Sequence, residues 1–231
     1  MNQSVQNYPG LAGSGALAAQ RNRVLRNTYW LLALSMVPTV LGAWIGVQTG
    51  FMQGLGAGMS AIVFLVGAFG FMFAIEKFKN SAAGVPLLLG FTFFMGLMLS
   101  RLLASVLGLA NGGSLIMLAF GGTGAIFLGM ATLSSVIKRD LSNMGKFLFI
   151  GMIMLLVAMI ANIFIQSSAL MITLSVLAIG IFSAFILHDL KQVQDGVQTN
   201  YISATLGVYL SLYNVFSNLL ALLGIFGGER D

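Results

Sequence analysis

The sequence contains no cysteine, one histidine and few charged residues, and each shortage excludes a class of chemistry. Without cysteine there are no disulfides and no thiolate ligands or nucleophiles. One histidine and six acidic residues do not favour a zinc site, which usually takes at least three protein ligands. Only 7% of the residues are charged and 58% are hydrophobic, whereas roughly a quarter are charged in a soluble domain. We therefore expect an integral membrane protein whose surroundings are the lipid bilayer.

The net charge of +5 has a membrane explanation, because Lys and Arg flanking apolar segments set their orientation. We therefore expect no nucleic-acid partner. Residues 1–20 are rich in Gly, Ala, Ser, Asn and Gln without a periodic apolar pattern. Together with three arginines up to residue 27, they predict a flexible, basic cytoplasmic tail. A signal peptide is the alternative interpretation, but the apolar run that follows is too long and no small-x-small cleavage site closes it.

Residues 28–226 divide into seven apolar runs, each near the roughly 20 residues that cross about 30 Å of hydrocarbon. The fifth and sixth runs are separated only by Gln166 and Ser167, and together they are too long for one crossing. We therefore expect a tight hairpin there and an all-α fold of seven membrane-spanning helices. The predicted spans are Thr28–Val47, Leu55–Ile75, Pro86–Leu109, Ser114–Ile137, Lys146–Ile165, Ser168–Leu190 and Ile202–Phe226.

The distribution of basic residues predicts the orientation. If the N-terminus is cytoplasmic, seven crossings place residues 227–231 in the periplasm, where Arg230 is the one basic residue. The outer connectors then contain no Lys or Arg. The inner side contains Arg21, Arg23, Arg26, Lys77, Lys79, Lys138, Arg139, Lys146 and Lys191.

Glycines predict close packing between helices, because small residues let two backbones approach each other in lipid. Glycines recur every four residues at the start of the second span, and a cluster of glycines lies within the fourth span. These glycines are Gly50, Gly54, Gly58, Gly121, Gly122, Gly124 and Gly129.

The last span has a polar stripe. Its members recur every three or four residues, so they share one face of a helix: Ser203, Gly207, Ser211, Asn214 and Asn218. Bare amides are costly against lipid, so this face is expected to meet a neighbouring helix or a wet cavity. Interhelical hydrogen bonding is one interpretation, and the lining of an ion or proton path is the other.

Asp189 lies where the sixth apolar run ends. If the helix stops at Leu190, this carboxylate is interfacial. If the helix continues to Asp195, Asp189 lies roughly 9 Å inside it and is partly desolvated, which suits proton sensing or cation handling. His188 would point about 100° away from Asp189 on a helix and is expected at the solvated rim.

Arg101 is a charged residue inside the third span. An ionisable group in a span is a functional candidate by default. The alternative is that Arg101 reaches the outer headgroups. Because it lies in the outer half of its span and Asp189 lies near the inner side, we expect no salt bridge between them.

Four segments resemble the Bax inhibitor family in its bacterial inner-membrane branch: Val24–Tyr29, Ala161–Phe164, Thr199–Ile202 and Val208–Asn214. The resemblance covers nearly the whole chain after residue 20. It implies a seven-helix bundle with the last helix at the centre and the other six around it. It also implies a partner, the membrane-anchored protease FtsH, which the chain would bind and inhibit as a slowly degraded substrate in membrane-protein quality control.

The family also contains pH-sensitive calcium-leak proteins, and the resemblance implies this alternative function. Two aspartates on the last two helices share a proton in those proteins. The first matches Asp189, but the family's Tyr-Leu-Asp motif reads Tyr209-Leu210-Ser211 here. A calcium or proton path therefore lacks one carboxylate. An intramembrane hydrolase would need a metal or a nucleophile–base pair, so we expect no enzyme, no catalytic residue and no cofactor.

Overall fold

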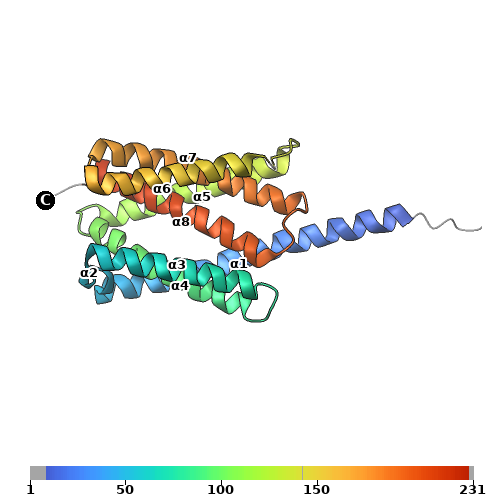
Figure 1. Ribbon diagram of the computed structural model, residues 1–231, viewed down its shortest axis with the longest axis horizontal. Helices are drawn as coiled ribbons and strands as arrows, with labels where there is room; N and C mark the ends of the chain where they lie inside the picture. The colour runs from blue at the N-terminus through green and yellow to red at the C-terminus, as the bar shows by residue number, and fades with distance from the viewer. Residues whose placement is uncertain (1–8, 142, 229–231) are drawn as a thin grey trace, which may run out of the picture.

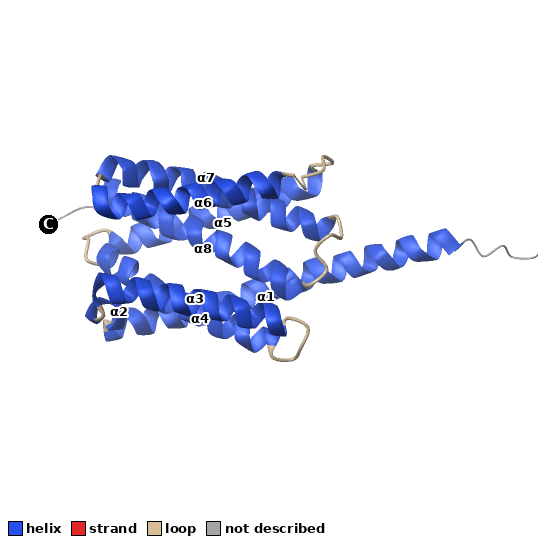
Figure 2. Cartoon of the chain, viewed as in Figure 1, coloured by secondary structure: helices blue, strands red, loops and turns tan. Residues whose placement is uncertain are grey.

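The computed structural model describes residues 9–141 and 143–228, and within these ranges all regular secondary structure is helical (Figure 2). Seven of the helices are long and apolar enough to cross a membrane. A short helix, α2 (Phe51–Gly54), follows the first of them. The seven are α1 (Pro9–Thr49), α3 (Gly56–Phe78), α4 (Gly84–Leu107), α5 (Gly112–Val136), α6 (Met144–Ile165), α7 (Ser168–Gln194) and α8 (Tyr201–Phe226).

These helices confirm the seven predicted spans, and most ends agree within three residues. The predicted hairpin between α6 and α7 is present. Gln166 adopts a left-handed conformation with φ of 54°, which reverses the chain. The side chain of Ser167 then accepts a hydrogen bond from the Leu170 amide at 3.2 Å and starts α7.

The N-terminal segment differs from the prediction, because α1 begins at Pro9 and residues 9–27 are helical. Residues 1–8 lie outside the described residues. Four alanines between residues 12 and 19 favour helix, and proline is well suited to the first turn. With 41 residues, α1 is about 60 Å long, roughly twice the hydrocarbon thickness. Its N-terminal part accordingly projects beyond the other helices (Figure 1).

The helices form two groups with α8 running between them (Figure 1). One group contains α1, α3 and α4, and the other contains α5, α6 and α7. Helix α8 contacts α1, α3, α4, α5 and α7, whereas α6 contacts only α7. The expectation that all six other helices surround the last one is therefore wrong for α6. Leu155 is the one fully buried residue along α6, and much of the apolar surface of this helix is left for lipid.

The largest buried cluster joins both groups through α8. Tyr209 of α8 is 1% exposed and packs edge-on against Phe91 of α4, with ring centroids 6.1 Å apart. Its hydroxyl lies 2.9 Å from the hydroxyl of Thr39 in α1 and donates to the carbonyl of Thr92 in α4 at 3.4 Å. This buried phenol ties α8 to two helices of the first group, and its polar tip is satisfied.

Helices α1 and α4 share the most extensive helix–helix contact, and glycines on both sides allow their backbones to approach closely. A Cβ added to Gly42 would lie 2.1 Å from the carbonyl oxygen of Phe93, and one added to Gly96 would lie 2.1 Å from that of Thr39. Gly46, one turn beyond Gly42, is similarly tight. We call Gly42, Gly46 and Gly96 the α1–α4 glycine interlock.

The glycines singled out from the sequence do not perform this role. No atom of a neighbouring segment lies within 4 Å of an added Cβ at six of the seven, and the seventh has only an ordinary contact with Leu219. Their faces point away from the neighbouring helices. The prediction of close packing at these positions is therefore wrong, although the principle holds at other glycines.

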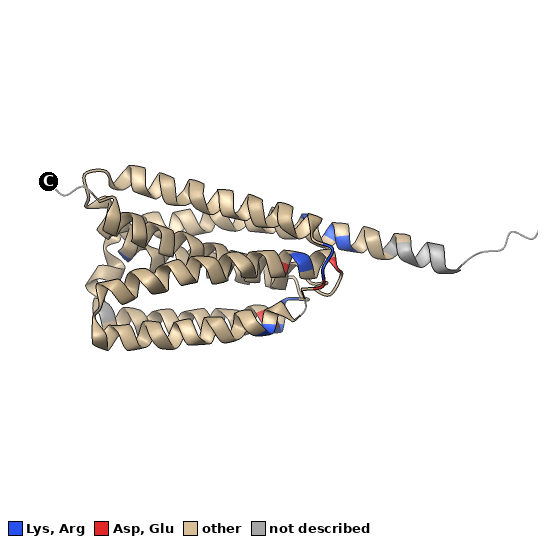
Figure 3. Cartoon of the chain, turned by 90° about the horizontal axis from the view of Figure 1, so that it is seen from above, with Lys and Arg blue, Asp and Glu red and all other residues tan. Residues whose placement is uncertain are grey.

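Most of the charged residues lie at the end of the bundle from which α1 projects (Figure 3). We call it the charged end. There, Asn200 caps α8 by accepting hydrogen bonds from the amides of Ile202 and Ser203. Its amide group also donates to the carbonyl of Lys79 and the side chain of Asn80. The connector between α7 and α8 is thus fixed to the connector between α3 and α4.

Candidate functional site

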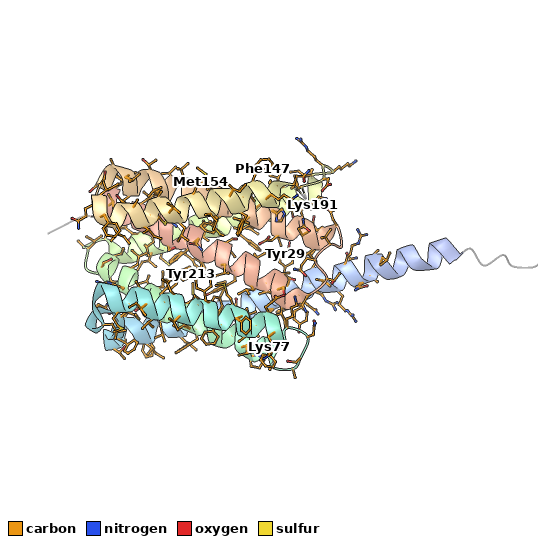
Figure 4. The ribbon with its side chains drawn as sticks, viewed as in Figure 1. Tyr29, Lys77, Phe147, Met154, Lys191 and Tyr213 are labelled. Atoms are coloured by element: carbon orange, nitrogen blue, oxygen red, sulfur yellow. The ribbon has the colours of Figure 1, made fainter. Side chains whose placement is uncertain are left out.

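Helix α7 extends past Leu190, which decides between the two sequence interpretations of Asp189. Its polar last turn is stabilised by an ion pair between Lys191 and Asp195 at 2.6 Å, and Gly196 with φ of 77° then ends it. Asp189 therefore lies roughly 7 to 8 Å before the helix end at Gln194. Figure 4 shows Lys191, two residues further along α7, at the charged end.

Asp189 faces α8. Its Oδ2 atom would lie 2.7 Å from a Cβ added to Gly207, so only glycine lets the carboxylate approach the α8 backbone this closely. Its Oδ1 atom lies 3.2 Å from Nδ1 of His188. Asp189 retains 24% of its side-chain exposure, so it is neither fully buried nor fully interfacial.

His188 is not the solvated rim residue that we expected, because its side chain is only 14% exposed. The ring packs over Gly145 at the start of α6, where an added Cβ would lie 2.8 Å from Nε2. Nε2 also lies 3.3 Å from the side-chain nitrogen Nε2 of Gln192, one turn further along α7. The contact between α6 and α7 therefore covers the imidazole.

A cavity of about 440 Å³ opens beside this pair, and we call it the Asp189 cavity. It is formed by the start of α6, the end of α7, the connector and the start of α8. Its polar groups come from four segments of the chain. The lining residues are Gly145, Lys146, His188, Asp189, Gln192, Val197, Gln198, Ser203, Ala204 and Gly207.

The polar stripe of α8 enters this cavity only at its first two members, Ser203 and Gly207. Ser211 is 4% exposed and lies one turn deeper. Asn214 and Asn218 donate to carbonyls of their own helix, both at 2.8 Å. No hydrogen bond from these two amides to another helix is found in the described part of the chain, so the expectation of interhelical bonding at these positions is not met.

Arg101 lies apart from the other candidates. It is exposed on α4, six residues before the helix ends, and no ion pair involves it within residues 9–141 and 143–228. The structure thus brings His188 and Asp189 together with the beginning of the α8 stripe. Arg101 lies outside this group, in agreement with the expectation that it forms no salt bridge with Asp189.

Several site residues were missed by sequence reasoning. Lys146, Gln192 and Gln198 line the cavity but carry no local signal, since ordinary polar residues flank every span. Within residues 9–141 and 143–228, no group of three or more His, Cys, Asp or Glu is close enough to hold a metal ion. The site is therefore a small polar cavity with one carboxylate, one imidazole and one ammonium group.

A second cavity of about 390 Å³ lies where α1 leaves the bundle, between Leu17–Val24 and residues 195–199. Arg21 donates to the backbone carbonyl of Gln194 at 3.1 Å, and the Gln194 side chain donates to Ser134 of α5 at 2.8 Å. Gln194 thereby links α1, α5 and α7 at the charged end.

The chain belongs to the Bax inhibitor family: the family model described as "Inhibitor of apoptosis-promoting Bax1" matches residues 21–228. It is 36% identical over 210 residues to the Escherichia coli K12 protein named "Modulator of FtsH protease YccA", covering 91% of this chain and 92% of that protein. An E. coli O6:H1 relative with the same identity and coverage is named "Inner membrane protein YccA". A Vibrio cholerae protein, 38% identical over 91% of this chain and 92% of its own length, is named "Uncharacterized membrane protein".

These comparisons confirm the resemblance read from the sequence. Together with seven apolar helices, they identify a multi-pass membrane protein. The names of the family and of the E. coli K12 relative describe an inhibitor and a modulator rather than an enzyme.

Proposed function

We propose that this chain binds an FtsH-type protease in the bacterial inner membrane and modulates it as a slowly degraded substrate. The observation that carries the proposal is the similarity to the FtsH modulator, which covers almost the whole of both chains. The match therefore extends over most of the chain and is not limited to a single helix or motif.

The projecting part of α1 supports a role as a handle for the protease. Basic residues concentrate at the charged end, and the positive-inside rule places that end in the cytoplasm (Figure 3). The C-terminus then lies in the periplasm after seven crossings. A short helical segment that projects from a bundle is marginally stable in water, so an unfolding enzyme can unravel the start of α1 at little cost.

The packing of α1 inside the bundle supports slow degradation. The handle continues directly into the helix of the α1–α4 glycine interlock. Pulling on the N-terminus must therefore separate α1 from α4, the pair with the most extensive contact, and Tyr209 adds a bond from α8 to the same helix. A protease that starts here meets its greatest resistance early, which keeps it occupied and spares other substrates.

Co-purification tests the proposal. Tagged full-length chain, extracted in mild detergent, should retain FtsH, whereas an unrelated seven-helix membrane protein with the same tag should not. A proteolytically inactive FtsH should be retained in larger amount, because a trapped substrate is not consumed. Equal FtsH recovery with both tagged proteins would contradict the proposal.

The Asp189 cavity favours a second candidate function, a cation or proton path. It places a partly exposed carboxylate beside the first turns of the α8 stripe, with Ser211, Asn214 and Asn218 continuing deeper on the same helix. Calcium prefers oxygen ligands, and this path offers one carboxylate with hydroxyl and amide oxygens.

Reconstituted vesicles test this path. Calcium should enter faster than in empty liposomes, and Asp189→Asn should lower the rate severalfold. Asp195→Asn is the matched control, because that carboxylate pairs with Lys191 and does not line the Asp189 cavity. Flux no higher than in empty liposomes would exclude a calcium path.

A further inference from the structure

The Asp189 cavity contains two opposite charges that do not neutralise each other. Lys146 and Asp189 both line it, from α6 and α7. In the part of the chain that the structure describes, Lys146 is in no ion pair, and Asp189 has only the neighbouring imidazole of His188. Asp189 is only 24% exposed, and a partly desolvated carboxylate without a full counter-charge is costly, so a ligand that brings a cation is favoured. Lys146 is exposed at the rim of the cavity, where its ammonium group is available to an anionic group of the same ligand.

The cavity lies at the charged end, beside the first turn of α6. Helix α6 contacts α7 but not α8, so no helix–helix contact closes the side between α6 and α8. The outer residues of α6, such as Phe147 and Met154, are 74% and 68% exposed (Figure 4). Because this end carries the charged residues that flank the apolar spans, we infer that the cavity opens toward lipid near the level of the headgroups.

We propose that the Asp189 cavity binds the phosphoethanolamine headgroup of a membrane phospholipid. This zwitterion carries an ammonium group for Asp189 and a phosphate for Lys146, so one ligand satisfies both charges. The start of α6 also favours a phosphate, because a helix N-terminus carries partial positive charge and the N-cap Asn143 makes no side-chain hydrogen bond to the first turn. A cavity of about 440 Å³ is large enough for such a headgroup, with its acyl chains remaining in the bilayer.

The hydrogen-bonding groups around the two charges suit the same ligand. Gln192 and Gln198 line the cavity, and their side-chain amides can donate to phosphate oxygens. Phosphatidylcholine has a quaternary ammonium without N–H donors, and phosphatidylglycerol has no ammonium, so each lacks one half of the match. This site is independent of any protease interaction, and its test does not involve FtsH.

Native mass spectrometry of the full chain in detergent, titrated with short-chain phospholipids, measures the preference. Phosphatidylethanolamine should bind about tenfold more tightly than phosphatidylglycerol or phosphatidylcholine, the difference expected for one charged hydrogen-bonded contact. Lys146→Gln and Asp189→Asn should each weaken its binding about tenfold. Asp189→Asn should also reduce the discrimination against phosphatidylglycerol, because the repelling carboxylate is gone. Lys138→Gln removes a positive charge from the same end outside the cavity and should change nothing.

Two results would overturn the proposal. The first is equal affinity for the three lipids, or wild-type preference in both variants. Lys146 is an exposed side chain, so Lys146→Gln is expected to remain folded. Its lipid preference therefore tests the proposal even if Asp189→Asn does not fold. The second is displacement by soluble phosphoethanolamine at the same affinity as the lipid, which would identify a free zwitterion as the ligand and exclude the membrane source.

Discussion

Gly96→Ala is expected to destabilise the bundle by about 3 kcal/mol, the upper end of the usual range for overpacking. The new Cβ would lie 2.1 Å from the carbonyl oxygen of Thr39, and a backbone atom cannot move aside as a flexible side chain can. The two helices must separate, which also disturbs Gly42 and Gly46 and lengthens the bond between Thr39 and Tyr209. Equilibrium unfolding in mixed detergent micelles measures the change.

Gly121→Ala is the matched control for this prediction. Gly121 lies in the interior of α5, and no neighbouring segment comes within 4 Å of an added Cβ. The same chemical change should leave the stability unchanged or raise it slightly, since alanine favours helix over glycine. Equal effects at positions 96 and 121 would show that the α1–α4 glycine interlock does not support the bundle.

The spans could be predicted from the sequence because the bilayer imposes a length that hydropathy detects directly. Hydropathy reports the hydrocarbon boundary rather than the helix end, and the two differ at α1 and α7. Alanines continue α1 outward to Pro9, and polar residues continue α7 to Gln194. For this reason the sequence alone left open whether Asp189 is interfacial or partly desolvated, because a helix can continue into the headgroup region.

The packing could not be predicted from the same pattern. Which glycines meet a neighbour depends on the rotation of each helix about its axis, and an almost uniformly apolar helix leaves that rotation unspecified. Gly42 and Gly46 do form a small-xxx-small motif, but Gly50, Gly54 and Gly58 form an equally regular one that meets no neighbour. The polar stripe of α8 and Asp189 were found because polar residues are rare here, whereas Lys146 joins the cavity only through the contact of α6 with α7.

Removing residues 1–20 is expected to abolish degradation by FtsH. An ATP-dependent unfolding enzyme needs a segment that it can engage without first dismantling the bundle, and the projecting start of α1 is the described segment that meets this requirement. The truncated chain retains Arg21–Thr49, about 44 Å of helix, which is still long enough to cross the membrane. Its bond from Arg21 to Gln194 is also retained.

The half-life of the chain in cells, with and without active FtsH, tests the central claim most directly. The account predicts slow FtsH-dependent loss of the full-length chain, no FtsH-dependent loss after removal of residues 1–20, and recovery when an unrelated flexible segment of the same length replaces them. A full-length half-life that does not depend on FtsH, or an unchanged half-life in the truncated chain, would contradict it.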